Sequence, residues 1–141
     1  MTGEKLACEL PATARSVTDA RRFVTNALRS WGRSELVDTA ALLTSEVVTN
    51  AVLHARTTVD VVIRQLRDGV SVEVSDGSQL PPQGRRTTPQ STTGRGMALL
   101  DQLAATWDVK VRSNGKTVRF TLRDGLDPWA AFAGRDWAGE A

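Results

Sequence analysis

The sequence predicts a single α+β domain, a two-layer sandwich of helices and paired strands. After a short N-terminal strand, two stretches of helical periodicity are followed by two stretches whose apolar residues alternate with a period of two, joined by a tight turn. A third helical stretch and a second alternating pair come next. At 141 residues the chain is long enough to bury one core and too short for two. We therefore expect residues 1–141 to form one domain, with a loosely patterned tail from about Asp124.

The composition is that of a globular protein that binds neither nucleic acid nor membrane. Hydrophobic residues make up 40% of the chain and charged residues 24%, which is a folded balance. The formal net charge is only +2, so there is no basic stripe for direct nucleic-acid contact. The single cysteine, Cys8, gives neither a disulfide framework nor a zinc cluster. No apolar run has membrane-spanning length, and the first ten residues lack a signal-peptide core, so we expect a cytoplasmic protein.

A strand and a helix are expected first. Residues 5–10 suit a short edge strand that Pro11 ends. The helix has Ser16 or Thr18 as its N-cap candidates, and Trp31-Gly32 stops it. Its exposed side carries four arginines, for which solvation is the simplest explanation: Arg15, Arg21, Arg22 and Arg29.

The second helix carries the most informative residues. It follows its expected N-cap, Ser34, and runs to about Ala55. Glu46 and Asn50 lie four residues apart, on one helical stripe about 100° round from the apolar residues of the buried face. That face is made by Leu43, Val47 and Ala51. A carboxylate and an amide oxygen beside a cavity can hold Mg²⁺ and orient or deprotonate a nucleophile. Two polar residues at a helix boundary with solvent are the equally acceptable structural explanation.

An antiparallel hairpin follows, and an aspartate ends it. Apolar residues alternate on both sides of the turn Asp68-Gly69: Val59, Val61 and Ile63 before it, and Val70, Val72 and Val74 after it. By this parity Asp76 points toward the helices, where a carboxylate needs hydrogen-bond donors. The local sequence has no charged partner for Asp76, so either the amino group of a ligand donates to it or it is a simple turn residue.

A long loop, residues 79–93, is rich in proline, serine and threonine and has no periodicity. Loops of that length are typical of binding lids or disordered segments. The loop closes on Gly94-Arg95-Gly96-Met97, which opens the third helix. Backbone N–H groups at such a helix start are suited to an anion, above all phosphate.

The last two strands flank a turn at residues 113–116. Their alternating residues are Trp107, Val109 and Val111 before the turn, and Val118, Phe120 and Leu122 after it. The tail holds three aromatic residues that either pack on the body or meet a partner: Trp129, Phe132 and Trp137.

Three familiar motifs can be rejected. Gly94-Arg95-Gly96 is not a dinucleotide fingerprint, because Leu99 stands in place of the third glycine and no strand precedes it. Gly115-Lys116-Thr117 is not the end of a P-loop, because a strand follows instead of a helix. A hydrolase triad has little support, because the one histidine, His54, has no evident orienting acid.

The remaining signals occur in a fixed order. They are Glu-x-x-x-Asn on a helix, an aspartate ending a strand, a loop closing on Gly-x-Gly, and Lys-Thr opening the last strand. Over about residues 34–122 this order resembles the ATP-binding domain shared by gyrase, histidine kinases, MutL and a heat-shock chaperone family. Within that superfamily the chain is similar to the small anti-sigma factor serine/threonine kinases of bacteria. The segments that carry this likeness are Glu46 to Ala55, Gly94 to Met97, Gly115 to Val118, Ala20 to Val24 and Trp31-Gly32.

The resemblance implies a Bergerat-type fold, a mixed but mostly antiparallel sheet with helices on one face and ATP beneath the lid. It implies that Glu46 is the general base and that Asn50 coordinates Mg²⁺ between the phosphates. Asp76 would accept the adenine amino group. Gly94, Arg95, Gly96 and Met97 would contact the phosphates, and Thr117 would reach the nucleotide from the last strand.

The implied activity is that of an ATP- and Mg²⁺-dependent kinase. Such a kinase binds a sigma factor, phosphorylates an anti-anti-sigma protein and works as a homodimer. An ATP-sensing binding module without catalysis is the alternative, and a detached histidine kinase domain has less support. The chain departs from the wider superfamily after Asp76, where Gly77-Ser78-Gln79-Leu80 lacks the two later glycines of Asp-x-Gly-x-Gly.

Overall fold

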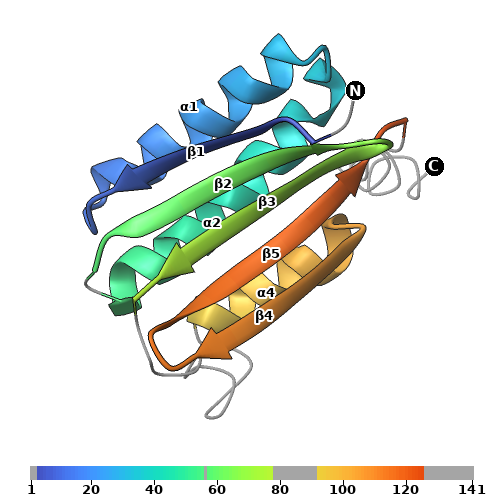
Figure 1. Ribbon diagram of the computed structural model, residues 1–141. Coiled ribbons are helices and arrows are strands. Elements are labelled where there is room, and N and C mark those ends of the chain that lie inside the picture. The colour runs from blue at the N-terminus through green and yellow to red at the C-terminus, as the bar shows by residue number, and fades with distance from the viewer. Residues whose placement is uncertain (1–2, 56, 78–91, 126–141) are drawn as a thin grey trace, which may run out of the picture.

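Five strands form one sheet in the computed structural model, which describes residues 3–55, 57–77 and 92–125 (Figure 1). The order across the sheet is β1-β2-β3-β5-β4. The strands are β1 (Lys5–Leu10), β2 (Val59–Leu66), β3 (Gly69–Asp76), β4 (Thr106–Arg112) and β5 (Gly115–Arg123). The helices are α1 (Arg15–Ser30), the 3-10 turn η1 (Ser34–Leu36), α2 (Val37–Ala55) and α4 (Thr92–Leu103).

The predicted α+β class is confirmed, and every pair of described neighbouring strands is antiparallel, without the parallel pair that a mixed sheet would contain. The reason lies in the connections. Between β1 and β2 the chain runs out along α1 and back along α2, so it re-enters the sheet beside the point where it left, with Val59 opposite Leu10. A parallel pair would need a crossover that carries the chain back to the opposite end of the sheet, where the first strand began.

The helices α1, α2 and α4 cover one face of the sheet (Figure 1). The alternating apolar residues predicted for β2, β3 and β5 all face these helices and are buried. On α2 the predicted face is confirmed as well, because Leu43, Val47 and Ala51 belong to the same buried core. The apolar stripe of α2 and the alternating apolar residues of the strands therefore pack into one core, as expected where a helix lies on a pleated sheet.

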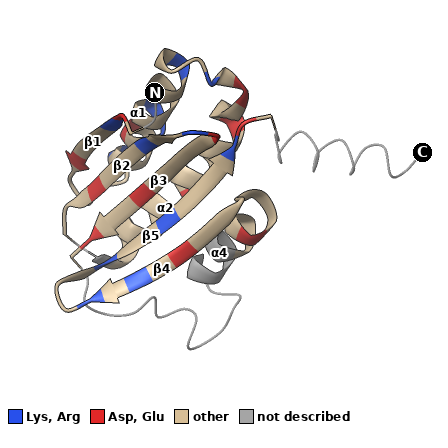
Figure 2. Ribbon diagram, turned by 45° about the vertical axis from the view of Figure 1, so that its right-hand side comes forward, with Lys and Arg blue, Asp and Glu red and all other residues tan. Residues whose placement is uncertain are grey.

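The other face of the sheet is polar, and charges of both signs are mixed on it (Figure 2). Glu73 on β3 lies opposite Arg119 on β5, and their charged groups are 3.8 Å apart. A shallow hollow on this face is lined by Glu73, Asp108, Lys110, Arg112 and Arg119 among others. Mixed charges over a sheet surface keep it soluble without creating a strong field of either sign.

Neither predicted N-cap of the first helix is correct. Helix α1 begins at Arg15, and its N-cap is Ala14, which makes no side-chain capping bond. Ser16 lies inside the first turn, and its hydroxyl donates to the carbonyl of Pro11 at 2.6 Å. Thr18 is an exposed helix residue further on.

The predicted stop of this helix at Trp31-Gly32 is confirmed. Gly32 has a φ of 75°, which favours glycine over residues with a side chain. The N–H of Arg33 donates to the carbonyl of Leu28 at 2.8 Å, and that of Gly32 donates to Arg29 at 3.1 Å. These two bonds form a Schellman motif, which satisfies carbonyls at the helix end.

Ser34 is not the cap of the second helix, because it is itself the first residue of the turn η1, whose N-cap is Arg33. The predicted end of α2 near Ala55 is confirmed. The segment Ser34–His54 has the length and mean hydropathy of a membrane span, but half of it is buried inside the domain. That burial is what a core helix of such a sandwich requires.

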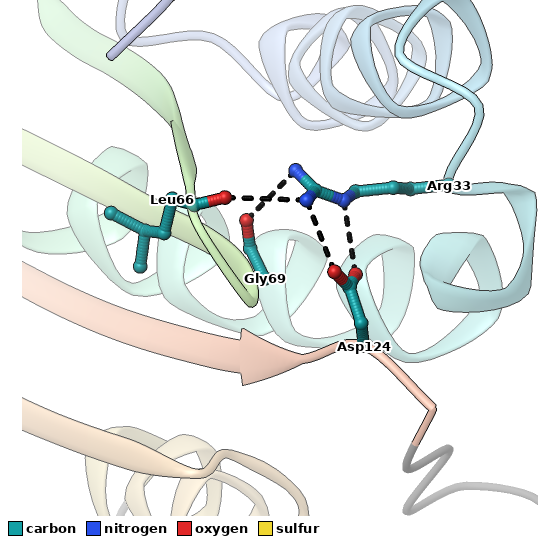
Figure 3. Close-up of polar contacts among 4 residues, drawn as sticks. All are labelled: Arg33, Leu66, Gly69 and Asp124. Atoms are coloured by element: carbon teal, nitrogen blue, oxygen red, sulfur yellow. Dashed lines mark hydrogen bonds and ion pairs between the residues drawn. The ribbon is translucent and has the colours of Figure 1, made fainter. Parts of the chain in front are cut away.

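One arginine closes the end of the sheet where the β2–β3 hairpin turns (Figure 3). The guanidinium of Arg33 donates to the carbonyls of Leu66 and Gly69 at 3.2 and 3.0 Å. Its Nε and Nη2 each lie 3.0 Å from a carboxylate oxygen of Asp124, just after β5. The side chain of Arg33 is 12% exposed, so these bonds form in a partly dry environment. Arg33 thus joins the start of the second helix to three strand ends.

We predict that Arg33→Ala lowers the free energy of unfolding by about 2–3 kcal/mol, because it leaves two strand-end carbonyls and one carboxylate without their charged donor. Arg33→Lys should recover only part of the loss, since an ammonium cannot make the two-pronged contact. Urea denaturation measures the effect. The exposed neighbour Arg123 is the control, and Arg123→Ala should change stability by less than about 0.5 kcal/mol. Equal effects at the two positions would show that the contacts of Arg33 contribute nothing.

Candidate functional site

Five elements meet at the end of the sheet that lies away from the β2–β3 hairpin (Figure 1). Helix α2 ends at Ala55, close in sequence to Val59, which begins β2 and pairs with Asp76 at the end of β3. Asp76 also pairs with Lys116 at the start of β5. Helix α4 begins at this end too, because it is joined to β4 by a short turn at the far end and runs antiparallel to it. The topology therefore gathers the predicted site segments at one end of the domain.

Glu46 and Asn50 lie on α2 as predicted, at the border of its buried face. Asn50 is 7% exposed, and its side-chain nitrogen Nδ2 is buried and has no hydrogen-bond partner within the described part of the chain. Glu46, one turn earlier, is half-buried. A buried amide nitrogen without an acceptor is costly, so a polar group that binds there recovers free energy.

Asp76 points to the helix-covered face, as its parity predicted. It is directly opposite Val59, a core residue, and its side chain is 1% exposed. The local sequence holds no charged partner for Asp76, but the neighbouring strand β5 supplies one. The ammonium of Lys116, itself 9% exposed, lies 3.0 Å from Oδ2 of Asp76.

Lys116 is the charged residue of the candidate site that sequence reasoning did not single out. Its partner is forty positions away in the chain, so a search of the local sequence around Asp76 could not find it. The available signal was the parity of the last strand. Because Val118, Phe120 and Leu122 face the core, Lys116 must face it as well, and a buried lysine needs a carboxylate.

Two backbone contacts fix the strand ends beside this ion pair. The N–H of Gly77 donates to the hydroxyl of Thr57 at 2.8 Å, which joins the end of β3 to the approach to β2. Gly115 lies so close to β3 that a Cβ there would be 2.2 Å from the carbonyl oxygen of Asp76. Its φ of 154° is also unfavourable for other residues. Glycine at position 115 therefore lets Lys116 reach Asp76 across the two strands.

Thr117 lies on the opposite face of the sheet from the side chain of Asp76. It pairs with Ser75, and the two hydroxyls are 2.8 Å apart. Arg112 also donates to the hydroxyl of Thr117. A hollow of about 250 Å³ at this end is lined by Thr117 together with Asp76, Lys116 and Gly77. Thr117 thus borders the same hollow but does not join the side chains on the covered face.

The glycine segment lies where a helix start was predicted. Gly94, Arg95, Gly96 and Met97 fall in the first part of α4, which begins two residues earlier, at Thr92. Their side chains lie outside the described residues, as do residues 78–91 of the predicted lid and the three tail aromatics. The helix start itself is at the site end of the sheet, which is compatible with the predicted contact to an anion.

Comparison with known protein families identifies a matching domain model. A family model described as a histidine kinase-like ATPase domain matches residues 10–122, from the end of β1 to the end of β5. The match therefore includes α2, the ion pair and the start of α4. A search of curated proteins found no match.

We predict that Lys116→Met lowers the free energy of unfolding by about 3 kcal/mol, because it leaves the carboxylate of Asp76 buried without its counter-charge. The double variant Lys116→Met with Asp76→Asn should be more stable than Lys116→Met alone, since the uncompensated charge is then gone. Denaturant titration of the four members of this cycle measures the coupling. Simple additivity of the two substitutions would contradict a direct ion pair in solution.

Proposed function

The chain belongs to the histidine kinase-like ATPase domain family, and on that basis we propose that it is an ATP- and Mg²⁺-dependent protein serine/threonine kinase. By its resemblance to the anti-sigma factor kinases, it binds a sigma factor in the cytoplasm as a homodimer and phosphorylates an anti-anti-sigma protein. ATP is the ligand that the family indicates. The particular acceptor, the sigma factor and the metal are the parts of the proposal that experiment must test.

The residues at the site end fit a metal-bound nucleotide. The amide of Asn50 offers a buried nitrogen that needs an acceptor, which a phosphate oxygen supplies, and an oxygen that suits Mg²⁺. Among the described residues, no three His, Cys, Asp or Glu side chains form a metal cluster. A site with few protein ligands suits Mg²⁺, because proteins hold Mg²⁺ through one or two side chains while phosphates and water complete its coordination shell.

The spacing of Glu46 and Asn50, one helical turn apart on α2, is the observation that supports phosphoryl transfer. Bound ATP would supply the phosphoryl group and leave as ADP, and Mg²⁺ would neutralise charge on the phosphates. The half-buried carboxylate of Glu46 then accepts the proton of the attacking serine or threonine hydroxyl, at a carboxylate oxygen one helical turn from Asn50. Phosphoryl transfer needs mainly positioning and charge neutralisation, so one acid and one amide at fixed spacing are sufficient protein chemistry.

A second surface supports the proposal of a protein partner. A hollow of about 500 Å³ between α1 and α2 is lined by Arg21, Arg22 and Arg29, and the guanidinium of Arg21 donates to Ser45 of α2 at 3.4 Å. Simple solvation was the expected explanation for these arginines. Their convergence on one hollow instead suits an acidic segment of a partner, because clustered arginines bind carboxylates strongly and with defined geometry.

We predict that Glu46→Gln retains ATP affinity within about twofold but lowers phosphate transfer at least about a hundredfold, since only the proton acceptor is removed. Calorimetry measures the affinity, and incorporation of labelled phosphate into the cognate antagonist measures transfer. Asp38→Asn, an exposed substitution at the other end of α2, is the matched control and should leave both unchanged.

Equal transfer by wild-type protein and the Glu46→Gln variant would refute the base assignment. Binding of ATP by the wild-type protein without transfer to any partner would instead favour the nucleotide-sensing module, whose role is to gate a protein interface.

We predict that Arg22→Glu weakens binding of the sigma factor at least about tenfold, because it reverses one charge in the hollow between α1 and α2. The partner is first recovered by pull-down from native cytosol with and without ATP, and its affinity is then measured by calorimetry. Arg15→Glu makes the same charge change on α1 at a position outside the residues that line this hollow. If both variants lose affinity equally, only the overall charge matters and the hollow is not the binding surface.

A further inference from the structure

The buried ion pair places a second charged group beside the position that the family resemblance assigns to the adenine. Lys116 and Asp76 stand in one cross-strand row, on the face of the sheet that the helices cover. The ammonium is 3.0 Å from Oδ2, and both side chains are at least nine-tenths buried. The resemblance assigns Asp76 to the amino group of adenine and assigns no role to Lys116.

Stability alone gives little reason for this pair. The adjacent row of the same three strands is made entirely of valines, Val61, Val74 and Val118. That row shows that apolar side chains fill the same layer of the sandwich. Replacing a buried ion pair by packed apolar residues is often neutral or stabilising, so a chain selected only for stability would not need charges here. A ligand that uses both charges explains why they are present.

The two residues of the pair also lie at the edge of a hollow. Asp76 and Lys116 line the hollow of about 250 Å³ at the end of the sheet, together with strand-end residues and residues of the uncovered face such as Ser75 and Thr117. An ammonium has three N–H donors and needs one for Oδ2, and a carboxylate has about four acceptor sites. A ligand can therefore receive a hydrogen bond from Lys116 and donate one to Asp76 while the ion pair stays closed.

We propose that Lys116 determines base specificity by donating a hydrogen bond to N1 of adenine while Asp76 accepts one from the neighbouring amino group. This inference rests on the proposed ATP site. The amino group and N1 are adjacent on one edge of adenine, one a donor and the other an acceptor, which matches a carboxylate and an ammonium at hydrogen-bond distance. Guanine in the same placement turns a carbonyl oxygen toward the carboxylate of Asp76, which repels it.

The first experiment varies the nucleotide and leaves the protein unaltered, so that no substitution can disturb the fold. Calorimetry compares ATP with 1-deaza-ATP, which has a C–H in place of N1, and with 7-deaza-ATP as the matched control on the other side of the ring. We expect 1-deaza-ATP to bind at least about tenfold more weakly than ATP, the loss typical of a hydrogen bond from a charged donor. The 7-deaza compound should bind within about twofold of ATP.

A protein variant provides the second arm. If Lys116→Met is folded, it should bind ATP and 1-deaza-ATP with equal affinity, because the donor that distinguishes them is gone. Equal binding of the two nucleotides by the wild-type protein would overturn the role of Lys116 and leave the ATP site intact. Failure of the wild-type protein to bind ATP at millimolar concentration would overturn the proposed function itself, and this inference with it.

Discussion

The register between β3 and β5 is the constraint on which the site depends. It sets Asp76 opposite Lys116 on the covered face of the sheet, and the same alternation puts the valines of β3 into the core. If β3 shifted by one residue, its valines and Asp76 would turn away from the core while Lys116 on β5 stayed in place, so the ion pair would be lost. Because burial of the apolar row fixes the register, the core of the domain also positions the ion pair. Fold stability and site geometry are therefore set by the same pairing.

Local patterns predicted most of the fold, and long-range pairing explains what they missed. The strands, the stop at Gly32 and the buried stripe of α2 each follow from periodicity or from one turn residue. The N-caps failed because their hydroxyls have other environments: Ser16 bonds to the carbonyl of Pro11, and Ser34 falls inside a 3-10 turn. The all-antiparallel sheet depends on how α1 and α2 return the chain to β2 and on the insertion of β5 between β3 and β4, which no single segment encodes.

The candidate site was partly predictable for the same physical reason. Glu46 and Asn50 followed from a helical repeat, and Asp76 followed from strand parity. Lys116 required knowledge that β3 and β5 are neighbours, because its partner is distant in sequence. Thr117, which the family likeness assigns to the nucleotide, lies on the opposite face of the sheet from Val118 and the core, as the alternation of the last strand requires.

The contacts of Arg33 have a consequence for how the domain fluctuates. An antiparallel sheet held at one end by a guanidinium bound to three strand termini is expected to open more readily at its other end, where the candidate site residues lie. Local opening at the site end would then leave the packing around Arg33 in place.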